Sequence, residues 1–290
     1  MIEVTAEDIE SVLDLSSLEN RLEGLKVSYR EGDPYPHILL ENFLDPEAYR
    51  RSVEEFKDLD NQNWNNYIHA NERKFSHRDS TEWGPTLQSV LRELNSPRFV
   101  SFLGEMIGVK DLVCDPSLEG GGLHQSTNGG FLNIHADFTV HPHHRHWRRR
   151  ANLLLYLNED WKSEYGGDLE LWAKDMSHCV EKVAPLGNRA LIFTTEADSF
   201  HGHPEPMTCP EGVARRSLAL YYFTIEENPE VRSTNYRARP GDGLHAIPIY
   251  LDRQLLRCYD WMKRRLGLSD ELVSKLFRGK DRLTRRGDKH

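Results

Sequence analysis

Residues 133–147, NIHADFTVHPHHRHW, place five histidines and one aspartate within fifteen positions. Imidazole nitrogens and carboxylate oxygens are ligands for transition metals, so some of these side chains are candidates for a metal site. His135 and Asp137 are two residues apart, and residues i and i+2 of a strand face the same side. On a strand, this spacing predicts that His135 and Asp137 present an imidazole and a carboxylate to one point.

A third ligand must come from another part of the chain. His201 and His203 both lie in DSFHGHPEP, directly after the apolar run 189–195. Two histidines and one carboxylate on one face of an octahedron leave three open positions, which is the arrangement of the non-heme Fe(II) oxygenases. We therefore expect Fe(II), held by His135, Asp137 and one of the two later histidines.

The other histidines are expected outside the metal site. Four of them lie among arginines, whose positive charge opposes a divalent cation, and are expected to be loop residues or substrate contacts: His141, His143, His144 and His146. His124 is expected to be structural. Segment 141–150 holds four arginines and four histidines, a basic patch on a chain of net charge −9. It is either a solvated loop or a contact for an anionic group.

The composition indicates a globular protein. Of the 290 residues, 38% are hydrophobic and 10% aromatic, which is enough for one packed core. The negative net charge argues against a nucleic-acid partner. No run of eighteen apolar residues and no basic-then-apolar leader occurs, so we expect neither a membrane span nor a signal peptide. Four scattered cysteines without a CxxC pair predict free thiols in a reducing cytoplasm.

The first 110 residues are predicted to be mainly helical. PHILLENFL (36–44) indicates a strand, and Asp45 is placed to cap a helix with Pro46 at its first position. The stretch 57–83 has no clear period and many Asn and Asp residues, which predicts a long loop. Two further helices are predicted at about 85–95 and 97–108. The acidic opening, MIEVTAEDIESVLDL, is typical of a short amphipathic helix.

From about residue 111 the pattern changes to short strands separated by Gly, Asn and Pro. The NGG turn at 128–130 joins GGLHQS to FLNIHAD, which predicts a hairpin. Further strands are predicted at 151–158, 168–173, 189–195 and 215–224, and helices near 247–266 and 269–278. Many short strands at even spacing favour a sandwich or barrel. We expect one structural domain with three parts: a helical support with edge strands (1–110), a β core (111–226) and a packed helical extension (227–290).

Six segments occur in an order that resembles the 2-oxoglutarate and Fe(II)-dependent dioxygenases, in their prolyl-hydroxylase-like branch. They are FLNIHAD, LLLYLNEDW, YGGDLELW, NRALIFTT, SFHGHPEP and RRSLALYYF, and they span about a third of the chain. The resemblance implies a mainly β fold with flanking helices, whose core is a double-stranded β-helix, a jelly-roll relative of the cupins.

Carried over by position, the resemblance implies that His135, Asp137 and His201 are the iron ligands. His201 is preferred to His203 because the family ligand follows an aromatic residue, here Phe200.

The resemblance also implies a site for the cosubstrate 2-oxoglutarate. Arg215 would pair with its distal carboxylate, with Ser217 beside it and the hydroxyl of Tyr156 bonded to the same group. Gln125 falls where relatives carry a polar cosubstrate contact. Neighbouring residues of a strand face opposite sides, so only one of Arg215 and Arg216 can enter the barrel, and the shared face of Arg215 and Ser217 favours Arg215.

The resemblance implies a dioxygenase that uses Fe(II), 2-oxoglutarate and O₂, releases succinate and CO₂, and is stimulated by ascorbate. Halogenases of this superfamily carry Gly or Ala in place of the aspartate, so Asp137 favours hydroxylation. The expected reaction is hydroxylation of an unactivated C–H in a small polar metabolite, an amino acid or its derivative. Two alternatives are a peptidyl, prolyl-type hydroxylase and a non-catalytic metal-binding or interaction domain.

Residues that contact the substrate are predicted from position alone. Asn133 and Asn152 have the strand parity to point into the barrel. Arg148 and Arg149 are expected at its mouth, where they would bind an anionic group of the substrate and leave the metal site unaffected. The C-terminal helices, with apolar spacing in IYLDRQLLRCYDWM, are the candidate surface for a homodimer.

Overall fold

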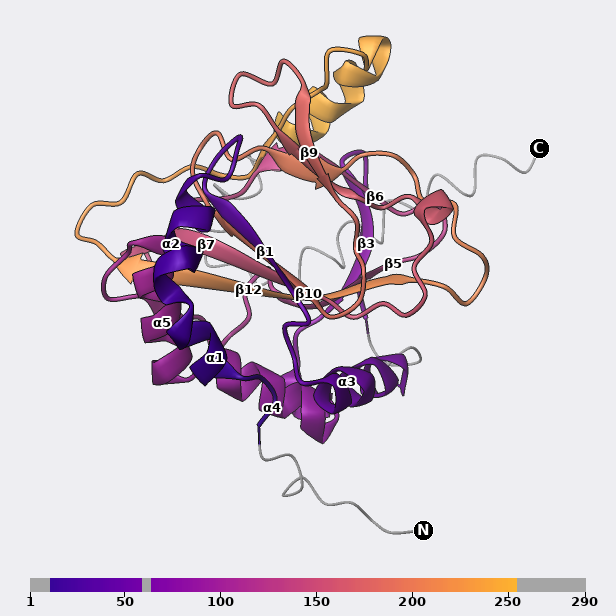
Figure 1. Ribbon diagram of the computed structural model, residues 1–290. Helices are drawn as coiled ribbons and strands as arrows, with labels where there is room; N and C mark the ends of the chain where they lie inside the picture. The colour runs from indigo at the N-terminus through magenta and orange to yellow at the C-terminus, as the bar shows by residue number, and fades with distance from the viewer. Residues whose placement is uncertain (1–10, 59–63, 255–290) are drawn as a thin grey trace.

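The computed structural model describes residues 11–58 and 64–254 (Figure 1). One connected antiparallel sheet curls into a half-barrel, and the helices of the first 110 residues lie against its outer side. The predicted fold class, a mainly β chain with flanking helices around a double-stranded β-helix, is confirmed.

The elements have the following bounds. The helices are α1 (Leu15–Asn20), α2 (Leu22–Arg30), α3 (Pro46–Asp58), α4 (Pro85–Leu94) and α5 (Pro97–Ile107), with 3-10 turns η3 (Ser80–Glu82), η4 (Ser163–Tyr165) and η5 (Gly243–His245). The strands of the first half are β1 (His37–Glu41), β2 (Asn65–His69), β3 (Glu72–His77), β4 (Val113–Cys114), β5 (Gly122–Ser126) and β6 (Phe131–Ala136). Those of the second half are β7 (Trp147–Tyr156), β8 (Leu169–Trp172), β9 (Cys179–Val183), β10 (Arg189–Thr194), β11 (His201–His203), β12 (Arg215–Ile225) and β13 (Asn235–Tyr236).

Local sequence signals explain where the helices begin. Asp45 Oδ1 accepts the backbone N–H of Glu47 at 2.9 Å, as predicted for the cap of α3. Ser96 Oγ accepts the N–H of Phe99 at 3.1 Å at the start of α5. That helix ends at Gly108, whose φ of 72° lies in the left-handed region that favours glycine.

The strand order along the sheet is β1-β10-β7-β12-β5-β3-β6-β11-β8-β9, with β13 on β6, β2 on β3 and β4 on β12. The predicted strands in the second half of the chain are all present. Strand β7 begins earlier than predicted, at Trp147, and the strands β9, β11 and β13 were not predicted.

Two predictions about the centre of the sheet are wrong. The segment 57–83 is not a long loop, because β2 and β3 form within it, and β3 lies between β5 and β6. Phe75 of β3 pairs with Gln125 and Glu72 pairs with Leu132, so β5 and β6 do not form a hairpin. The NGG turn is compatible with either arrangement, since it leaves room for a third strand between the two it joins.

Strand β12 has two contrasting faces. Leu218, Leu220 and Tyr222 belong to the main hydrophobic core together with residues of the helices. The Tyr222 hydroxyl donates to the Leu94 carbonyl of α4 at 2.9 Å. The opposite face of β12, which starts with Arg215, is turned into the half-barrel.

Several predictions concern the two ends of the chain. Residues 11–14 are not helical, and the rest of the proposed N-terminal helix lies outside the described residues. A helix is present over 246–254, while the remainder of both C-terminal helices, and so the candidate dimer surface, also lies outside them. Within the described residues, no helix is long and apolar enough to cross a membrane. Cys114, Cys179 and Cys209 are free thiols.

Candidate metal centre

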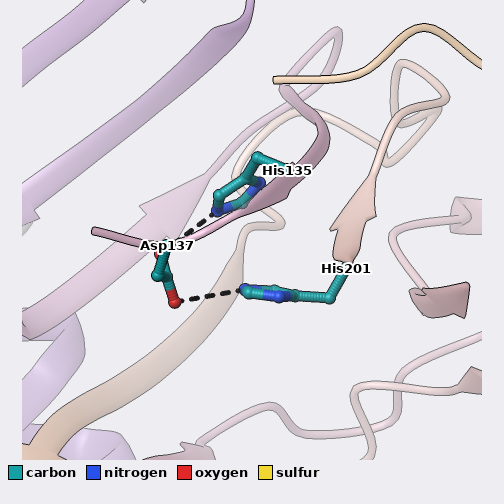
Figure 2. A group of neighbouring side chains, drawn as sticks. All are labelled: His135, Asp137 and His201. Atoms are coloured by element: carbon teal, nitrogen blue, oxygen red, sulfur yellow. Dashed lines mark ion pairs between the residues drawn. The ribbon is translucent and has the colours of Figure 1, made fainter. Parts of the chain in front are cut away.

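The three predicted metal ligands lie together inside the half-barrel (Figure 2). His135 is in β6, Asp137 follows the end of that strand, and His201 begins β11. The two strands are antiparallel neighbours in which His201 is directly opposite His135. Sheet register, together with the i, i+2 spacing, therefore brings the three side chains to one point.

The ligand atoms face one another. His135 Nε2 is 3.4 Å from Asp137 Oδ1, and His201 Nε2 is 3.5 Å from Asp137 Oδ2. One ligand atom from each residue lies within 4.8 Å of the others, and no second such group occurs among the described residues. The three side chains are largely buried, with His135 and His201 each 5% exposed.

Both imidazoles are held in the orientation that a metal requires. His135 Nδ1 is 2.9 Å from the carbonyl oxygen of Asn133, and His201 Nδ1 is 3.0 Å from that of Ser199. A carbonyl oxygen only accepts, so each Nδ1 donates a proton to it, and each Nε2, which faces Asp137, is the atom left to bind a metal. Two imidazoles and one carboxylate fit a divalent transition metal.

Electrostatics favour the metal-binding forms of His201 and Asp137. Burial lowers the pKa of His201 to about 4, which leaves the ring neutral at pH 7. Burial alone would raise the pKa of Asp137, but Arg149 and the two imidazoles together hold it well below its ordinary value.

The histidines of the basic patch lie away from this centre, whereas His203 lies inside the barrel. His141 is buried beside Asp115, with its Nε2 3.3 Å from Oδ2, and His144 stacks on Trp147. His203, the alternative third ligand, is also buried, and Arg215 and Lys74 contribute after burial to a pKa well below its usual range. Its ring therefore lies within electrostatic range of Arg215, two residues along β11 from His201.

Arg215 and Tyr156 form a second polar group within the barrel. The Arg215 Nε donates to the carbonyl oxygen of Gly167 at 2.8 Å, and its Nη2 donates to the Tyr156 hydroxyl at 3.3 Å. Ser217 pairs directly with Tyr156 across β12 and β7, so the three side chains share one face. Burial raises the pKa of Tyr156, while Arg215 opposes the shift, so the phenol remains a hydrogen-bond donor.

Residues 121–223 match the 2OG-Fe(II) oxygenase superfamily. This range includes the three predicted metal ligands and the group formed by Arg215, Tyr156 and Ser217. This segment is a 2-oxoglutarate–Fe(II) oxygenase core. The protein is thus an enzyme of the 2-oxoglutarate-dependent dioxygenase class, with Fe(II) as its metal and 2-oxoglutarate and O₂ as cosubstrates.

Solved structures agree on the fold of this oxygenase. A prolyl 4-hydroxylase from Pseudomonas putida aligns over 70% of this chain and 100% of its own, at 17% identity and a TM-score of 0.50. A prolyl hydroxylase from Trichoplax adhaerens, in complex with a hypoxia inducible factor peptide fragment, aligns over 72% and 93%, at 16% identity and 0.54. A prolyl 4-hydroxylase from Phytophthora capsici aligns over 97% and 92%, at 18% identity and 0.53. No curated protein sequence matches the chain.

Two predicted substrate residues of the oxygenase core instead contact Asp137, a predicted metal ligand. Asn152 Nδ2 donates to Asp137 Oδ2 at 2.7 Å, and Arg149 Nη2 lies 3.0 Å from the same oxygen. Arg149 is only 1% exposed. The expectation that Arg149 lies at the barrel mouth and leaves the metal site unaffected is therefore wrong.

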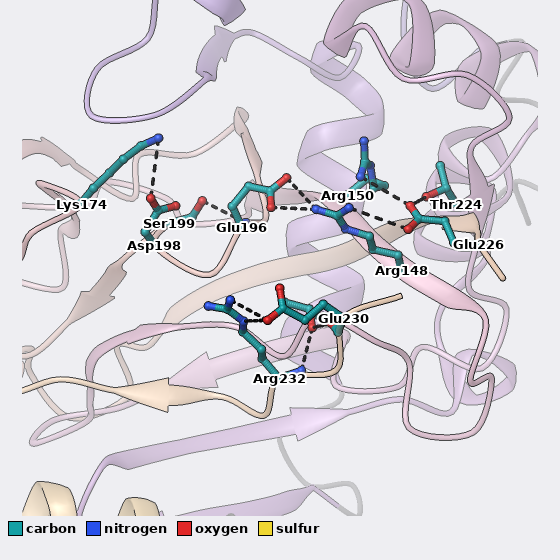
Figure 3. A network of polar contacts seen from close by, with 11 residues as sticks. Arg148, Arg150, Lys174, Glu196, Asp198, Ser199, Thr224, Glu226, Glu230 and Arg232 are labelled. Atoms are coloured by element: carbon teal, nitrogen blue, oxygen red, sulfur yellow. Dashed lines mark hydrogen bonds and ion pairs between the residues drawn. The ribbon is translucent and has the colours of Figure 1, made fainter. Parts of the chain in front are cut away.

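Arg148 and Arg150 point the opposite way, toward acidic groups on the surface (Figure 3). Arg148 Nη2 is 2.9 Å from Glu196 Oε2, and Arg150 Nη1 is 3.6 Å from Glu226 Oε1. Arg148 Nη1 is also 3.8 Å from Glu226. These carboxylates partly neutralise the positive charge of the segment 141–150, so the segment is less suited to bind an anionic group of the substrate.

Gln125 does not lie near the predicted cosubstrate site, and the side chain of Asn133 is bonded outside the predicted substrate site. Gln125 pairs with Arg216, so it lies on the face of the sheet away from Arg215. The Asn133 amide donates to the Ala70 carbonyl oxygen at 3.2 Å, at the turn between β2 and β3. Arg216 itself is turned toward the helices, with its Cζ 5.7 Å from the centre of the Phe56 ring.

Three polar residues inside the barrel were not predicted as part of the site. His124 is directly opposite Ser217, and burial lowers its pKa to about 3, an effect that Lys74 increases. Lys74 and Glu72 of β3 form an ion pair of 3.0 Å. A predicted pairing of β5 with β12 could have placed His124 beside Ser217, in the predicted cosubstrate site. Lys74 and Glu72 lie in a segment without a strand signal.

Proposed function

We propose that the protein hydroxylates an unactivated C–H bond of a small polar metabolite, an amino acid or a derivative of one. In this proposal His135, Asp137 and His201 hold Fe(II). The observation that supports the substrate class is the Lys74–Glu72 ion pair inside the barrel, which offers one positive and one negative group to a zwitterion.

Arg215 and Tyr156 are proposed to bind the distal carboxylate of 2-oxoglutarate. A guanidinium presents two parallel N–H donors that match a carboxylate, and it stays charged when buried. Tyr156 and Ser217 share the face of Arg215 and supply further hydroxyl donors to the same oxygens. His203 and His124, both neutral by burial, flank this region without adding charge.

Bound Fe(II) supplies O₂ activation coupled to decarboxylation of 2-oxoglutarate to succinate and CO₂. The protein contributes ligands, orientation and exclusion of water. Phe193 packs edge-on against the His201 ring with centroids 4.7 Å apart, and Tyr236 lies over the His135 ring at 5.2 Å. These rings keep the surroundings of both imidazoles apolar and fix their planes.

The charged pair supports an amino acid through complementary contacts. Lys74 Nζ lies 5.6 Å from the centre of the Tyr67 ring, and burial, which would lower its pKa, is outweighed by Glu72, so the ammonium stays charged. Glu72 is ionised for the same reason. A substrate carboxylate can approach Lys74 while a substrate amine approaches Glu72.

A peptidyl substrate is the second candidate. Three of the structures of similar fold are prolyl hydroxylases, and one of them is a complex with a peptide fragment. A non-catalytic metal-binding domain is the third, and it would form no succinate from 2-oxoglutarate with any substrate.

The test is a mass-spectrometric screen with Fe(II), 2-oxoglutarate and ascorbate. Free amino acids, their derivatives and proline-containing peptides are compared for gain of one oxygen and for succinate release. We expect an amino acid or derivative to be hydroxylated, and Lys74→Gln to raise its KM without changing the Kd of 2-oxoglutarate. Lys182→Gln is the matched control, because Lys182 pairs with Glu170 at 2.8 Å on the outside of the sheet. Hydroxylation confined to peptides would favour the second candidate.

A further inference from the structure

The guanidinium of Arg149 is enclosed beside a metal-ligand carboxylate. Its Cζ lies 3.4 Å from the centre of the Tyr221 ring and 4.7 Å from that of Phe138, so aromatic rings fix the plane of the group. A buried cation requires an anionic partner, and Asp137 Oδ2 lies 3.0 Å from Arg149 Nη2.

A β-bulge in β7 turns Arg149 to this side. In the pairing of β7 with β12, Tyr222 is opposite Ala151 and Phe223 is opposite Arg149, so Arg150 is passed over. Strict alternation from Asn152 would place Arg150 inside the barrel; the extra residue places Arg149 there. Bulges commonly re-aim a side chain next to a functional site, and this one delivers a cation to Asp137.

Arg149 and Asn152 hold the same oxygen of Asp137. Asn152 Nδ2 donates to Oδ2 at 2.7 Å, and Asn152 Oδ1 accepts from Arg149 Nε at 2.7 Å and from Thr195 Oγ1 at 3.2 Å. Arg149, Asn152 and Asp137 therefore form a closed triangle, in which each residue contacts the other two. The other oxygen, Oδ1, lies 3.4 Å from His135 Nε2, while Oδ2 is also 3.5 Å from His201 Nε2. Of the two oxygens, only Oδ1 is without a contact to Arg149 or Asn152.

We propose that Arg149 and Asn152 form one positioning unit, which holds Oδ2 of Asp137 and so presents Oδ1 to the metal. The proposal rests on the proposed function, in which Asp137 is a metal ligand. A carboxylate with one oxygen engaged by the protein binds through the other, and open positions are thereby kept for 2-oxoglutarate and O₂. Neither Arg149 nor Asn152 touches the reacting atoms in this role.

A simpler role for Arg149 makes the opposite prediction. If it served only as counter-ion for a buried carboxylate, its removal would take a positive charge away from the metal site, and a divalent cation would bind more tightly. Loss of a group that orients a ligand typically weakens metal binding by about 10- to 100-fold. The sign of the change in metal affinity therefore separates the two roles.

The experiment is calorimetric titration of Co²⁺ into the metal-free full-length protein. We expect Arg149→Met and Asn152→Ala each to weaken Co²⁺ binding by about 10- to 100-fold, and the double variant to be little weaker than either. Arg148→Met, the outward neighbour, is the matched control and should bind as the parent does. Unchanged or tighter binding by Arg149→Met, or additive losses in the double variant, would overturn the proposal.

Two additional variants keep the result interpretable. Arg149→Lys retains the charge but loses the Nε–H that bonds Asn152, so we expect it to bind Co²⁺ weakly; full recovery would mean that charge alone suffices. If Arg149→Met does not fold, as judged by circular dichroism, Asn152→Ala decides the question because it leaves the cation in place. His201→Ala tests the metal site itself: if that variant binds Co²⁺ like the parent, the set of ligands assumed in the proposed function is wrong, whatever Arg149 does.

Discussion

The sheet formed by β7 and β12 carries two kinds of chemistry on its two faces. Toward the helices it presents Leu153, Leu155, Leu218 and Leu220, all in the main hydrophobic core. Toward the barrel interior the same strands present polar and charged groups around the candidate metal centre and the proposed cosubstrate site: Arg149, Asn152, Tyr156, Arg215, Ser217 and Tyr221. One face stabilises the fold and the other positions reactive groups, so substitutions only one residue apart should have different consequences.

The largest expected effect is on metal binding. His201→Ala removes one of three ligands and should abolish measurable Fe(II) binding in anaerobic titration, together with turnover. His144→Ala, which removes a ring stacked on Trp147 outside the barrel, should bind Fe(II) like the parent. If His201→Ala retains parental affinity, His203 becomes the candidate third ligand.

Arg215 and Arg216, which begin β12, lie on opposite faces of the sheet, so their substitutions compare the two faces directly. Removing one partner of a buried charge pair costs roughly 2–5 kcal/mol, or on the order of 30- to 4,000-fold in affinity. Arg215→Ala should therefore weaken 2-oxoglutarate binding by at least the lower figure, and Arg216→Ala should change it little. Anaerobic titration of the Fe(II) protein, followed by the metal-to-ligand charge-transfer band, measures both. If Arg216→Ala loses binding and Arg215→Ala does not, the cosubstrate binds on the face of β12 opposite to the one proposed.

A core leucine should show the converse pattern. Leu220 is 2% exposed among residues of the helices, and a Leu→Ala change in such a position lowers the free energy of unfolding by about 2–5 kcal/mol. We expect Leu220→Ala to unfold at lower denaturant concentration with an unchanged Kd for 2-oxoglutarate. Leu251→Ala, at a position 63% exposed, is the control and should have no measurable effect.

The polar interior should also make stability depend on pH. Burial opposes protonation of His69, but the hydrogen bonds that its ring donates to the carboxylates of Asp252 and Glu72 raise its pKa to about 9. The pKa is higher in the folded protein than in the unfolded chain, so this contribution, on the order of 3 kcal/mol, is complete below about pH 6.5 and is lost as pH rises toward 9. Urea unfolding of the parent and of His69→Gln at pH 6 and pH 9 measures it. An equal difference between the two proteins at both pH values would contradict the assignment.

The smallest effect is expected for the outward arginines. Arg148 is partly exposed between Glu196 and Glu226, and exposed ion pairs contribute about 0–1 kcal/mol. Arg148→Gln should change the free energy of unfolding by less than 1 kcal/mol in chemical denaturation and leave substrate KM unchanged. A raised KM would restore the basic patch as a substrate contact.

The sequence predicted the parts of the site that depend on regular alternation. The i, i+2 spacing of His135 and Asp137 and the opposite faces of Arg215 and Arg216 follow from strand geometry alone. Arg149 could not be placed in this way, because the bulge at Arg150 reverses the alternation and three consecutive arginines give no pattern that reveals it.

The strand β3 was missed for a related reason. Its inward residues Glu72 and Lys74 are charged because they face the site rather than an apolar core, so ERKFSH lacks the hydrophobic alternation by which strands are recognised. Its position between β5 and β6 depends on pairing with residues about fifty positions later, which no local signal contains. Strand prediction therefore failed at β3, whose inward residues belong to the proposed substrate site.

The insertion of β3 between β5 and β6 also determines what can fold alone. A fragment limited to residues 121–223 would lack β3 and so leave β5 and β6 with unpaired backbone N–H and C=O groups in the middle of the sheet. Such open edges recruit strands from other chains, and we expect the fragment to aggregate when expressed. During synthesis β2 and β3 emerge before either of their partners, so the half-barrel closes only when an early hairpin is captured by later strands.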